Sequence, residues 1–199
     1  MDQKFSLPIH ADADAYYMST PEVVAQHIAE RLSGYRAAVE LCCAVGMTSI
    51  QLAKRVEHVY AIDFNTKRLA DARHNARLYG VNNITFLRGD ALDAELLKTM
   101  NADVAILDPD WSKAGDLDKS SHTADMQQTQ PSLVEMMRLT RQYITSDIVA
   151  RMPKTFTKEM LEVFGPCRVE NISWDSKLRF KVVYYLRSIR EYSETEVVF

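Results

Sequence analysis

The 199-residue sequence predicts an α/β fold with a mostly parallel seven-stranded sheet, helices on both faces and an antiparallel strand near one edge. Short apolar runs alternate with stretches of helical periodicity, a pattern typical of a parallel sheet covered by helices. The last quarter instead contains two consecutive strand-like runs without a helix between them, which predicts an antiparallel neighbour. The chain is also long enough to bury one complete hydrophobic core.

The elements follow in order along the chain. The first 16 residues have no steady apolar period and are interpreted as an N-terminal arm, so one domain is expected over 17–199. A helix is expected to begin at Ser19-Thr-Pro-Glu22, with a hydroxyl cap and an early proline. Helices are also predicted from about residue 50 and over 67–79, and strands over 37–43, 59–63, 84–87, 104–107, 148–150, 169–174 and 180–186.

The composition excludes several classes of protein. A charged fraction of 26% and a hydrophobic fraction of 47% argue against a disordered or fibrous chain. No apolar run approaches the roughly 20 residues of a membrane span, and the N-terminus does not resemble a signal peptide. Three cysteines, two of them adjacent, form neither a disulfide framework nor a paired zinc site. We therefore expect a cytoplasmic protein without a metal or a membrane partner.

The formal net charge of −3 conceals an asymmetry along the chain. Residues 91–130 carry eight acids and three bases, whereas residues 131–190 carry eleven bases and six acids. A basic C-terminal third can face the phosphates of a nucleic acid while the rest of the chain stays acidic. The alternative is that its bases only solvate helix faces, as Arg138, Arg141, Arg151, Lys154 and Lys158 would. The polar segment 113–130 is the one long loop candidate.

Unusual residues follow four of the predicted strands. In open α/β sheets, ligands bind beyond the carboxyl ends of the strands, near the point where the strand order reverses. The four predicted strand ends carry, in order, Glu40-Leu-Cys-Cys-Ala-Val-Gly-Met-Thr48, Asp63, Gly89-Asp90 and Asp108-Pro-Asp-Trp111.

The turn after the first strand favours a ligand without phosphates. A dinucleotide-binding turn needs three glycines so that the pyrophosphate can approach the backbone, and here the positions are Ala44, Gly46 and Ser49. Asp63 can still hold the hydroxyls of a ribose, and Asp90 can accept a hydrogen bond from an adenine amine. S-adenosylmethionine, which contains adenine, ribose and an amino acid but no phosphate, fits these groups.

Each of these residues also has a purely structural interpretation. Asp63 can cap the following helix, and Asp90 can be a turn residue. Cys42 and Cys43 can be small core residues of a buried strand rather than nucleophiles. The occurrence of four such groups at successive strand ends favours the functional interpretation.

The tetrapeptide Asp108-Pro-Asp-Trp111 indicates a reaction at an amine. A side-chain oxygen and a backbone carbonyl can both accept hydrogen bonds from an exocyclic amine of a base and direct its lone pair at a methyl group. Pro109 fixes the turn because its φ is restricted, and Trp111 can stack on an extruded base. Such a reaction depends on positioning and needs no metal. The alternative is a strand that ends in a proline turn with a half-buried tryptophan.

With these motifs in order, the chain resembles a Rossmann-like class I S-adenosylmethionine-dependent methyltransferase. More narrowly, it is similar to the RNA cap guanine-N2 methyltransferase family, that of trimethylguanosine synthase. The resemblance covers roughly residues 17–112 and weakens toward the end of the chain. It is carried by the segments 19–29, 40–53, 60–63, 75–80, 89–90 and 108–111.

The resemblance implies roles for particular residues. Asp108 and Pro109 should receive the amine, Trp111 should stack on guanine, and the helix that begins near Thr20 should close over the site. The family's glycine-rich turn and its second motif proline are replaced here by Ala44-Val-Gly-Met47 and Asp110. The residues implied to line the cofactor site are Thr20, Glu40, Cys42, Ala44, Gly46, Asp63, Phe64, Asp90 and Asp108.

The leading hypothesis is an enzyme that transfers methyl from S-adenosylmethionine to an exocyclic guanine amine in RNA, leaving S-adenosylhomocysteine. One alternative is a methyltransferase fold that binds cofactor or RNA without catalysis, supported by Asp110 and Met47. Another is an N-methyltransferase that acts on a small molecule or a protein. Asp110 favours a cationic methylated guanine but opposes a cap triphosphate, so the sequence leaves cap and non-cap guanine open.

Overall fold

The computed structural model describes residues 4–112, 122–174 and 176–199, so part of the predicted loop over 113–130 lies outside the described residues. The helices are α1 (Ala13–Met18), α2 (Glu22–Arg31), α3 (Met47–Ala53), α4 (Thr66–Leu78), α5 (Ala94–Leu97), α6 (Leu133–Tyr143) and α7 (Lys158–Glu162). The strands are β1 (Ala37–Leu41), β2 (His58–Asp63), β3 (Ile84–Arg88), β4 (Val104–Leu107), β5 (Ile148–Pro153), β6 (Arg168–Trp174), β7 (Lys177–Tyr185) and β8 (Ser193–Val198).

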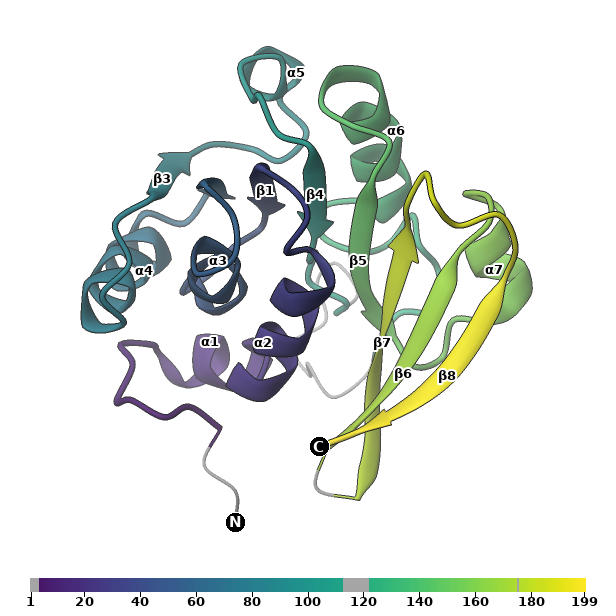
Figure 1. Ribbon diagram of the computed structural model, residues 1–199, viewed down its shortest axis with the longest axis horizontal. Helices are drawn as coiled ribbons and strands as arrows, with labels where there is room; N and C mark the ends of the chain where they lie inside the picture. Colours follow the sequence, from purple (N-terminus) through teal and green to yellow (C-terminus); the bar gives the residue numbers. More distant parts are fainter. Residues whose placement is uncertain (1–3, 113–121, 175) are drawn as a thin grey trace.

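The strands form one sheet in the order β3-β2-β1-β4-β5-β7-β6-β8, with β3 at one edge and β8 at the other (Figure 1). The first five strands of this order pair in parallel. β7 runs antiparallel to both of its neighbours, β5 and β6, and β8 is parallel to β6. The predicted fold class is therefore confirmed, with its antiparallel strand near one edge, but the sheet has eight strands rather than seven.

The eighth strand escaped prediction because its sequence carries little apolar signal. β8 reads Ser-Glu-Thr-Glu-Val-Val, and most of its residues are exposed. Polar contacts to the neighbouring strand hold it: the Asn171 amide donates to Glu194 and to Glu196 at 2.8 Å each. Lys181 donates to Glu194 at 2.8 Å. Such cross-strand polar contacts can stabilise an edge without the period-2 apolar pattern that predicts strands.

Helices cover both faces of the sheet, because alternate residues of each strand point to opposite sides. On one face, Ala38 and Val59 belong to the core cluster that includes α2 and α3, and Ala61 packs with Leu69 of α4. On the other face, Val39 and Leu41 belong to the cluster that includes α5, α6 and α7. The strand order reverses at β1, which pairs with both β2 and β4. A ligand site is therefore expected beyond the carboxyl ends of these strands.

The segment before α2 packs against the domain at one end of the sheet (Figure 1). Phe5 is buried, and its ring meets Tyr16 edge to face with the centroids 5.2 Å apart. The expected boundary between residues 16 and 17 falls inside α1. The predicted cap of the following helix is wrong: the Ser19 hydroxyl donates to the Ala15 carbonyl at the end of α1, and Pro21 precedes α2 without a side-chain cap.

Candidate active site

A cavity of about 1230 Å³ lies beyond the carboxyl ends of the parallel strands. This volume exceeds the roughly 300–1,000 Å³ of most small-molecule sites, so the cavity has room for a cofactor and part of a second ligand. It is lined by ten of the residues predicted for the site: Thr20, Glu40, Cys42, Ala44, Asp63, Phe64, Asp90, Asp108, Pro109 and Trp111.

Gly46 is the predicted site residue that does not line this cavity. It shapes the turn between β1 and α3 instead, where it has φ +83° and precedes the first residue of α3. Cys42 and Ala44 of the same turn also have positive φ angles, 68° and 46°. Left-handed conformations cost energy in residues other than glycine and are concentrated at functional sites. The turn therefore keeps a left-handed conformation at Ala44, although the family that the chain resembles has a glycine-rich sequence in this turn.

Asp63 joins two of the turns at the base of the cavity. Its Oδ2 accepts a hydrogen bond from the Ala44 amide at 2.8 Å, and its Oδ1 accepts one from the Asn65 amide at 2.8 Å. The cap of α4 is Asn65, whose side chain accepts from the amides of Lys67 and Arg68. Helix capping therefore does not explain Asp63, which is buried at the end of β2 and faces the cavity.

Glu40 is a buried carboxyl group in the wall of the cavity. It lies on β1, is 2% exposed, and accepts a hydrogen bond from the Ser49 hydroxyl of α3. Burial, with a smaller contribution from the charge of Asp108, raises the pKa of Glu40 to about 8 despite the opposing hydrogen bond from Ser49. At neutral pH this carboxyl is mostly protonated, and a cation placed beside it would favour its ionised form.

The remaining residues predicted for the cofactor surround the cavity at different depths. Thr20 is buried, whereas Phe64 is 69% exposed and presents an aromatic ring at the cavity wall. Asp90 accepts a hydrogen bond from the Leu92 amide at 2.8 Å, so its interpretation as a turn residue is correct while it also lines the cavity. Burial raises the pKa of the Cys42 thiol well above its usual range, so this thiol stays protonated.

Asp108 forms a largely buried ion pair with Arg151 in the cavity. Its Oδ1 accepts from the Arg151 Nε at 2.7 Å, and each side chain is 13% exposed. Burial raises the pKa of Asp108, the charge of Arg151 opposes this, and Asp110 adds to the rise. For Arg151 the alternative interpretation, a base that only solvates a helix face, is wrong, because Arg151 is a residue of β5 and lines the cavity.

Trp111 stands beside this ion pair. Its ring contacts Phe180 at a centroid distance of 6.1 Å and meets His122 edge to face at 5.2 Å. The Arg151 guanidinium carbon lies 4.8 Å from the centroid of the Trp111 ring, and the Trp111 Nε1 donates to the Arg151 carbonyl at 3.2 Å. The aromatic surface predicted to receive a base is thus placed next to the carboxylate predicted to receive its amine.

The neighbouring residues hold this motif in shape. Asp110 pairs with Gln130 through both backbone hydrogen bonds, at 2.9 and 2.8 Å. Its Oδ1 accepts from the amide and the hydroxyl of Ser112 at 2.9 and 2.8 Å. The Asp110 carboxylate, which stands where the family has its second motif proline, is therefore hydrogen-bonded within its own turn.

Acidic and basic side chains both line the cavity. Acids stand at the ends of β1, β2 and β4, and the basic side chains are Lys4, Arg68, Arg151 and Arg179, of which Arg151 pairs with Asp108. Burial and the charges of Arg151 and Arg179 lower the pKa of Lys4 to about 7. Sequence reasoning assigned none of Lys4, Arg68, Arg151 and Arg179 to the site. Arg151 directly follows the fifth predicted strand, which places it near the strand ends but does not indicate its pairing with Asp108.

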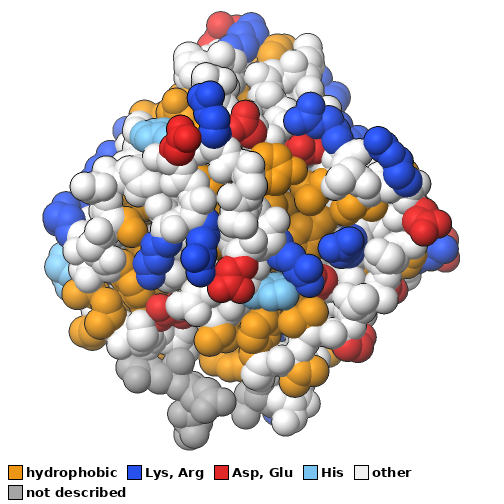
Figure 2. Space-filling model, viewed as in Figure 1, with side chains coloured by type: hydrophobic (Ala, Val, Ile, Leu, Met, Phe, Trp, Pro, Cys, Tyr) orange, Lys and Arg blue, Asp and Glu red, His pale blue; other side chains and the backbone are white. Residues whose placement is uncertain are grey.

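Most of the basic C-terminal third lies elsewhere. Arg138 pairs with Glu135 at 2.9 Å, and Lys158 pairs with Glu162 at 4.0 Å. Figure 2 shows Lys and Arg side chains scattered over one face of the molecule, several of them beside acidic side chains. Only Arg151 and Arg179 of the eleven bases in residues 131–190 line the cavity.

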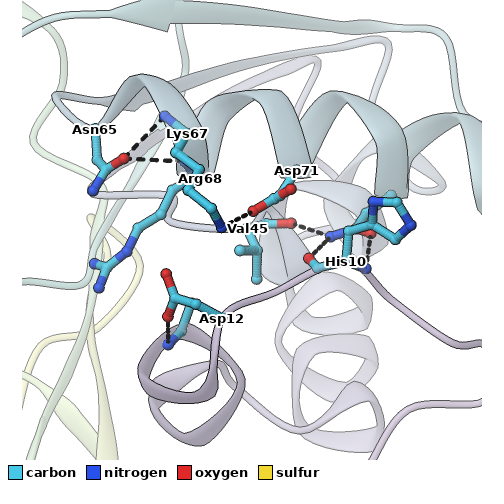
Figure 3. Close-up of polar contacts among 9 residues, drawn as sticks. His10, Asp12, Val45, Asn65, Lys67, Arg68 and Asp71 are labelled. Carbon is cyan, nitrogen blue, oxygen red and sulfur yellow. Dashed lines mark hydrogen bonds and ion pairs between the residues drawn. The ribbon is translucent and has the colours of Figure 1, made fainter.

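The N-terminal segment lines part of the cavity and is held in place by the buried side chain of Asn75. The Asn75 side chain of α4 exchanges hydrogen bonds with the backbone of His10, at 2.8 and 3.0 Å, and donates to the Val45 carbonyl at 3.0 Å. Figure 3 shows His10 and Val45 meeting at α4, with Arg68 extending from the start of this helix on the side of Asp12. This contact fixes the N-terminal segment to the turn after β1.

Within residues 4–112, 122–174 and 176–199, no group of three or more His, Cys, Asp and Glu side chains is arranged to hold a metal ion. Over the same residues, no helix has the length and hydrophobicity needed to span a membrane.

Comparisons with known proteins find relatives that are described as uncharacterized RNA methyltransferases. The chain is 31% identical over 116 residues to an uncharacterized RNA methyltransferase of Halalkalibacterium halodurans, which covers 54% of this chain and 24% of the relative. The chain thus spans about a quarter of the length of the first curated relatives it matches.

Solved structures share the fold. A protein of Porphyromonas gingivalis W83 described as a methyltransferase superimposes with a TM-score of 0.69 at 18% identity, covering 88% of this chain and 43% of that protein. Another such protein, from Streptococcus mutans and solved in complex with S-adenosylhomocysteine, gives a TM-score of 0.57 at 13% identity, covering 81% and 96%.

The family model described as RNA cap guanine-N2 methyltransferase matches residues 35–188, from the start of β1 to beyond the end of β7. The match includes the turn after β1, the acid at the end of β2 and the Asp108-Pro-Asp-Trp111 motif. It covers well over half of the chain, and the fold and the cavity agree with it. The chain therefore belongs to the RNA cap guanine-N2 methyltransferase family of class I S-adenosylmethionine-dependent methyltransferases.

Proposed function

We propose that this protein transfers a methyl group from S-adenosylmethionine to the exocyclic N2 amine of a guanine in RNA. The observation that carries the proposal is the placement of Asp108 and Trp111 together in the wall of a large cavity with the acids of β1 and β2. This arrangement offers an amine acceptor and an aromatic surface within one site.

The residues around Asp63 suit the cofactor. Asp63 can accept from the two ribose hydroxyls, while Asp90 and the exposed ring of Phe64 can contact adenine. Glu40 can balance the positive charge of the amino acid portion. The turn after β1 offers a single glycine, which suits a ligand without phosphate. When bound, S-adenosylmethionine supplies an electrophilic methyl group.

The residues around Asp108 suit the acceptor base. Asp108 accepts a hydrogen bond from the amine and directs the nitrogen lone pair toward the methyl group. Transfer of the methyl group would require the nitrogen to give up a proton, for which Asp108 is a suitable acceptor because burial raises its pKa. Lys4 and Arg179, which also line the cavity, can contact RNA phosphates.

The cysteines argue against covalent catalysis through a thiolate. Burial raises the pKa of Cys42, Cys43 and Cys167, the three cysteines of the chain. A thiol that stays protonated at neutral pH is a weak nucleophile. This supports direct transfer to an amine nitrogen.

The proposal is tested by incubating the purified protein with labelled S-adenosylmethionine and total RNA, followed by nucleoside analysis. We expect label in N2-methylguanosine and no label with the matched Asp108→Ala protein. Label in a different nucleoside, or in protein or small molecules alone, would contradict the proposed acceptor. Tight cofactor binding without transfer to any of these pools would instead support a binding protein.

Trp111→Ala is expected to raise the KM for RNA by roughly tenfold to a hundredfold, because stacking of a base on an aromatic side chain contributes about 1–3 kcal/mol. Steady-state kinetics with a defined RNA substrate would measure the change. Trp111→Phe keeps an aromatic surface and should restore most of the affinity. Since Trp111 also packs on Phe180, thermal unfolding of each variant should be compared. An unchanged KM in Trp111→Ala would remove the assigned role.

Cofactor binding at pH 7 is expected to release between about 0.5 and 1 proton per protein molecule. Glu40 has a pKa of about 8 in the free protein and is mostly protonated, and the cationic cofactor beside it should lower this pKa. Calorimetric titrations in buffers of different ionisation enthalpy measure the released protons. Glu40→Gln, which cannot ionise, serves as the control, and a release that persists in this variant would assign the proton to another group.

A further inference from the structure

The guanidinium of Arg151, a residue of β5, lies against two neighbouring aromatic rings. Its central carbon lies 4.8 Å from the centroid of Trp111 and 5.2 Å from the centroid of Phe180. The Arg151 Nε donates to Asp108 Oδ1 at 2.7 Å, and the side chain is 13% exposed. A planar cation that lies on an aromatic face and donates to a carboxylate is well held.

These contacts are the ones that the acceptor base would make. The Watson–Crick edge of guanine contains the N1–H group, C2 and the N2 amine, which repeat the planar N–C–N arrangement of a guanidinium. The proposed function places this edge on Asp108 and the ring on Trp111. Both groups are already engaged by Arg151, so a base cannot occupy the same ring face and the same carboxylate oxygen while Arg151 remains there.

We infer that Arg151 is the resident occupant of the acceptor-base position and is displaced when the base enters, an inference that rests on the proposed function. When Arg151 leaves, Trp111 loses a planar group on its ring and Asp108 loses a hydrogen-bond donor. A base with a planar ring and an amine replaces both contacts. A base without the amine leaves the buried Asp108 carboxylate without a donor, which is strongly unfavourable. Displacement of Arg151 therefore adds to the selection of the base.

The surroundings of Arg151 favour its departure. Its charge contributes to the lowered pKa of both Lys4 and His122, so it lies close to other basic groups. Asp108 opposes this repulsion, and Asp110 lies near enough to Asp108 to influence its pKa. An amine that takes over Asp108 removes the closest attraction that holds Arg151 and leaves the repulsion from Lys4 in place.

The test uses the fluorescence of Trp111 in a Trp174→Phe background, in which Trp111 is the single tryptophan of the chain. Guanosine is titrated into this protein and into the same protein carrying Arg151→Ala. We expect guanosine to bind the Arg151→Ala protein about tenfold more tightly, because no resident group must leave. Guanidinium chloride at millimolar concentration should compete with guanosine in the Arg151→Ala protein and have little effect on the background protein.

Arg151→Lys is the second variant, because it keeps a positive charge for Asp108 but has no planar group to lie on Trp111. It should also bind guanosine more tightly than the Trp174→Phe background protein. Weaker guanosine binding in both variants overturns the inference, since Arg151 would then help to hold the base. If RNA methylation persists in that case, the proposed function stands. If no protein in the series responds to guanosine and none forms N2-methylguanosine, both fail.

Discussion

Replacing Asp108 by alanine is expected to lower the kcat for methyl transfer by on the order of 10³, because the amine loses the group that orients it and accepts its proton. Asp108→Asn keeps an acceptor oxygen of the same size but no charge, so we expect a smaller loss of about tenfold. Single-turnover rates with saturating cofactor and RNA separate this effect from binding.

Removal of the Asp108 carboxylate also affects its ion-pair partner, Arg151. Asp108→Ala leaves the Arg151 guanidinium, 13% exposed, without its carboxylate, and this unpaired charge can destabilise the fold. The double variant Asp108→Ala/Arg151→Ala removes the unpaired charge and should unfold at a higher temperature than the single variant while staying equally slow. A kcat within about threefold of the unsubstituted protein would exclude Asp108 from the reaction.

Replacing Asp63 by alanine is expected to weaken S-adenosylmethionine binding by about 10²- to 10⁴-fold, since each hydrogen bond to a charged group contributes roughly 1.5–3 kcal/mol and a ribose offers two hydroxyls. The Ala44 and Asn65 amides also lose their acceptor, which should lower the free energy of unfolding by about 1–3 kcal/mol for each unsatisfied amide. Calorimetry for the cofactor and chemical denaturation measure the two effects separately.

Asp63→Asn is the matched control because its side-chain oxygen can still accept from one of the two amides. It should be more stable than the alanine variant while still binding the cofactor weakly, because it lacks the charge. Unchanged cofactor affinity in the alanine variant, together with reduced stability, would show that Asp63 only joins the two turns.

Much of the fold could be predicted because the strands of a buried parallel sheet appear in the sequence as short apolar runs. β1, β2 and β4 lie within a residue or two of their predicted positions, and the polar residues at their ends do meet in one cavity. Strand ends of a parallel sheet converge whatever the details of the helices, so this part of the site needed only the fold class.

The other half of the cavity could not be predicted, because it depends on contacts between distant parts of the chain. Arg151 gives no local sign that it will pair with Asp108, since the pair forms only when β5 lies beside β4. Lys4 is held at the cavity because its Nζ donates to the Tyr16 and Tyr17 carbonyls near the end of α1. No residue pattern in the sequence indicates these contacts. The net charge of −3 does not exclude the proposed RNA substrate, because four basic side chains line the cavity whatever the charge of the whole chain.

The polar edge strand β8 has a consequence for the behaviour of the protein in concentrated solution. An exposed sheet edge offers unpaired backbone groups to a strand of another molecule and is a common origin of aggregation. Here the outermost strand carries Glu194 and Glu196, whose carboxylates are engaged by Asn171 of the adjacent strand. Charged side chains of an edge strand that turn inward disfavour pairing with a strand of another molecule, so we expect the sheet to resist extension into intermolecular fibres at the β8 end.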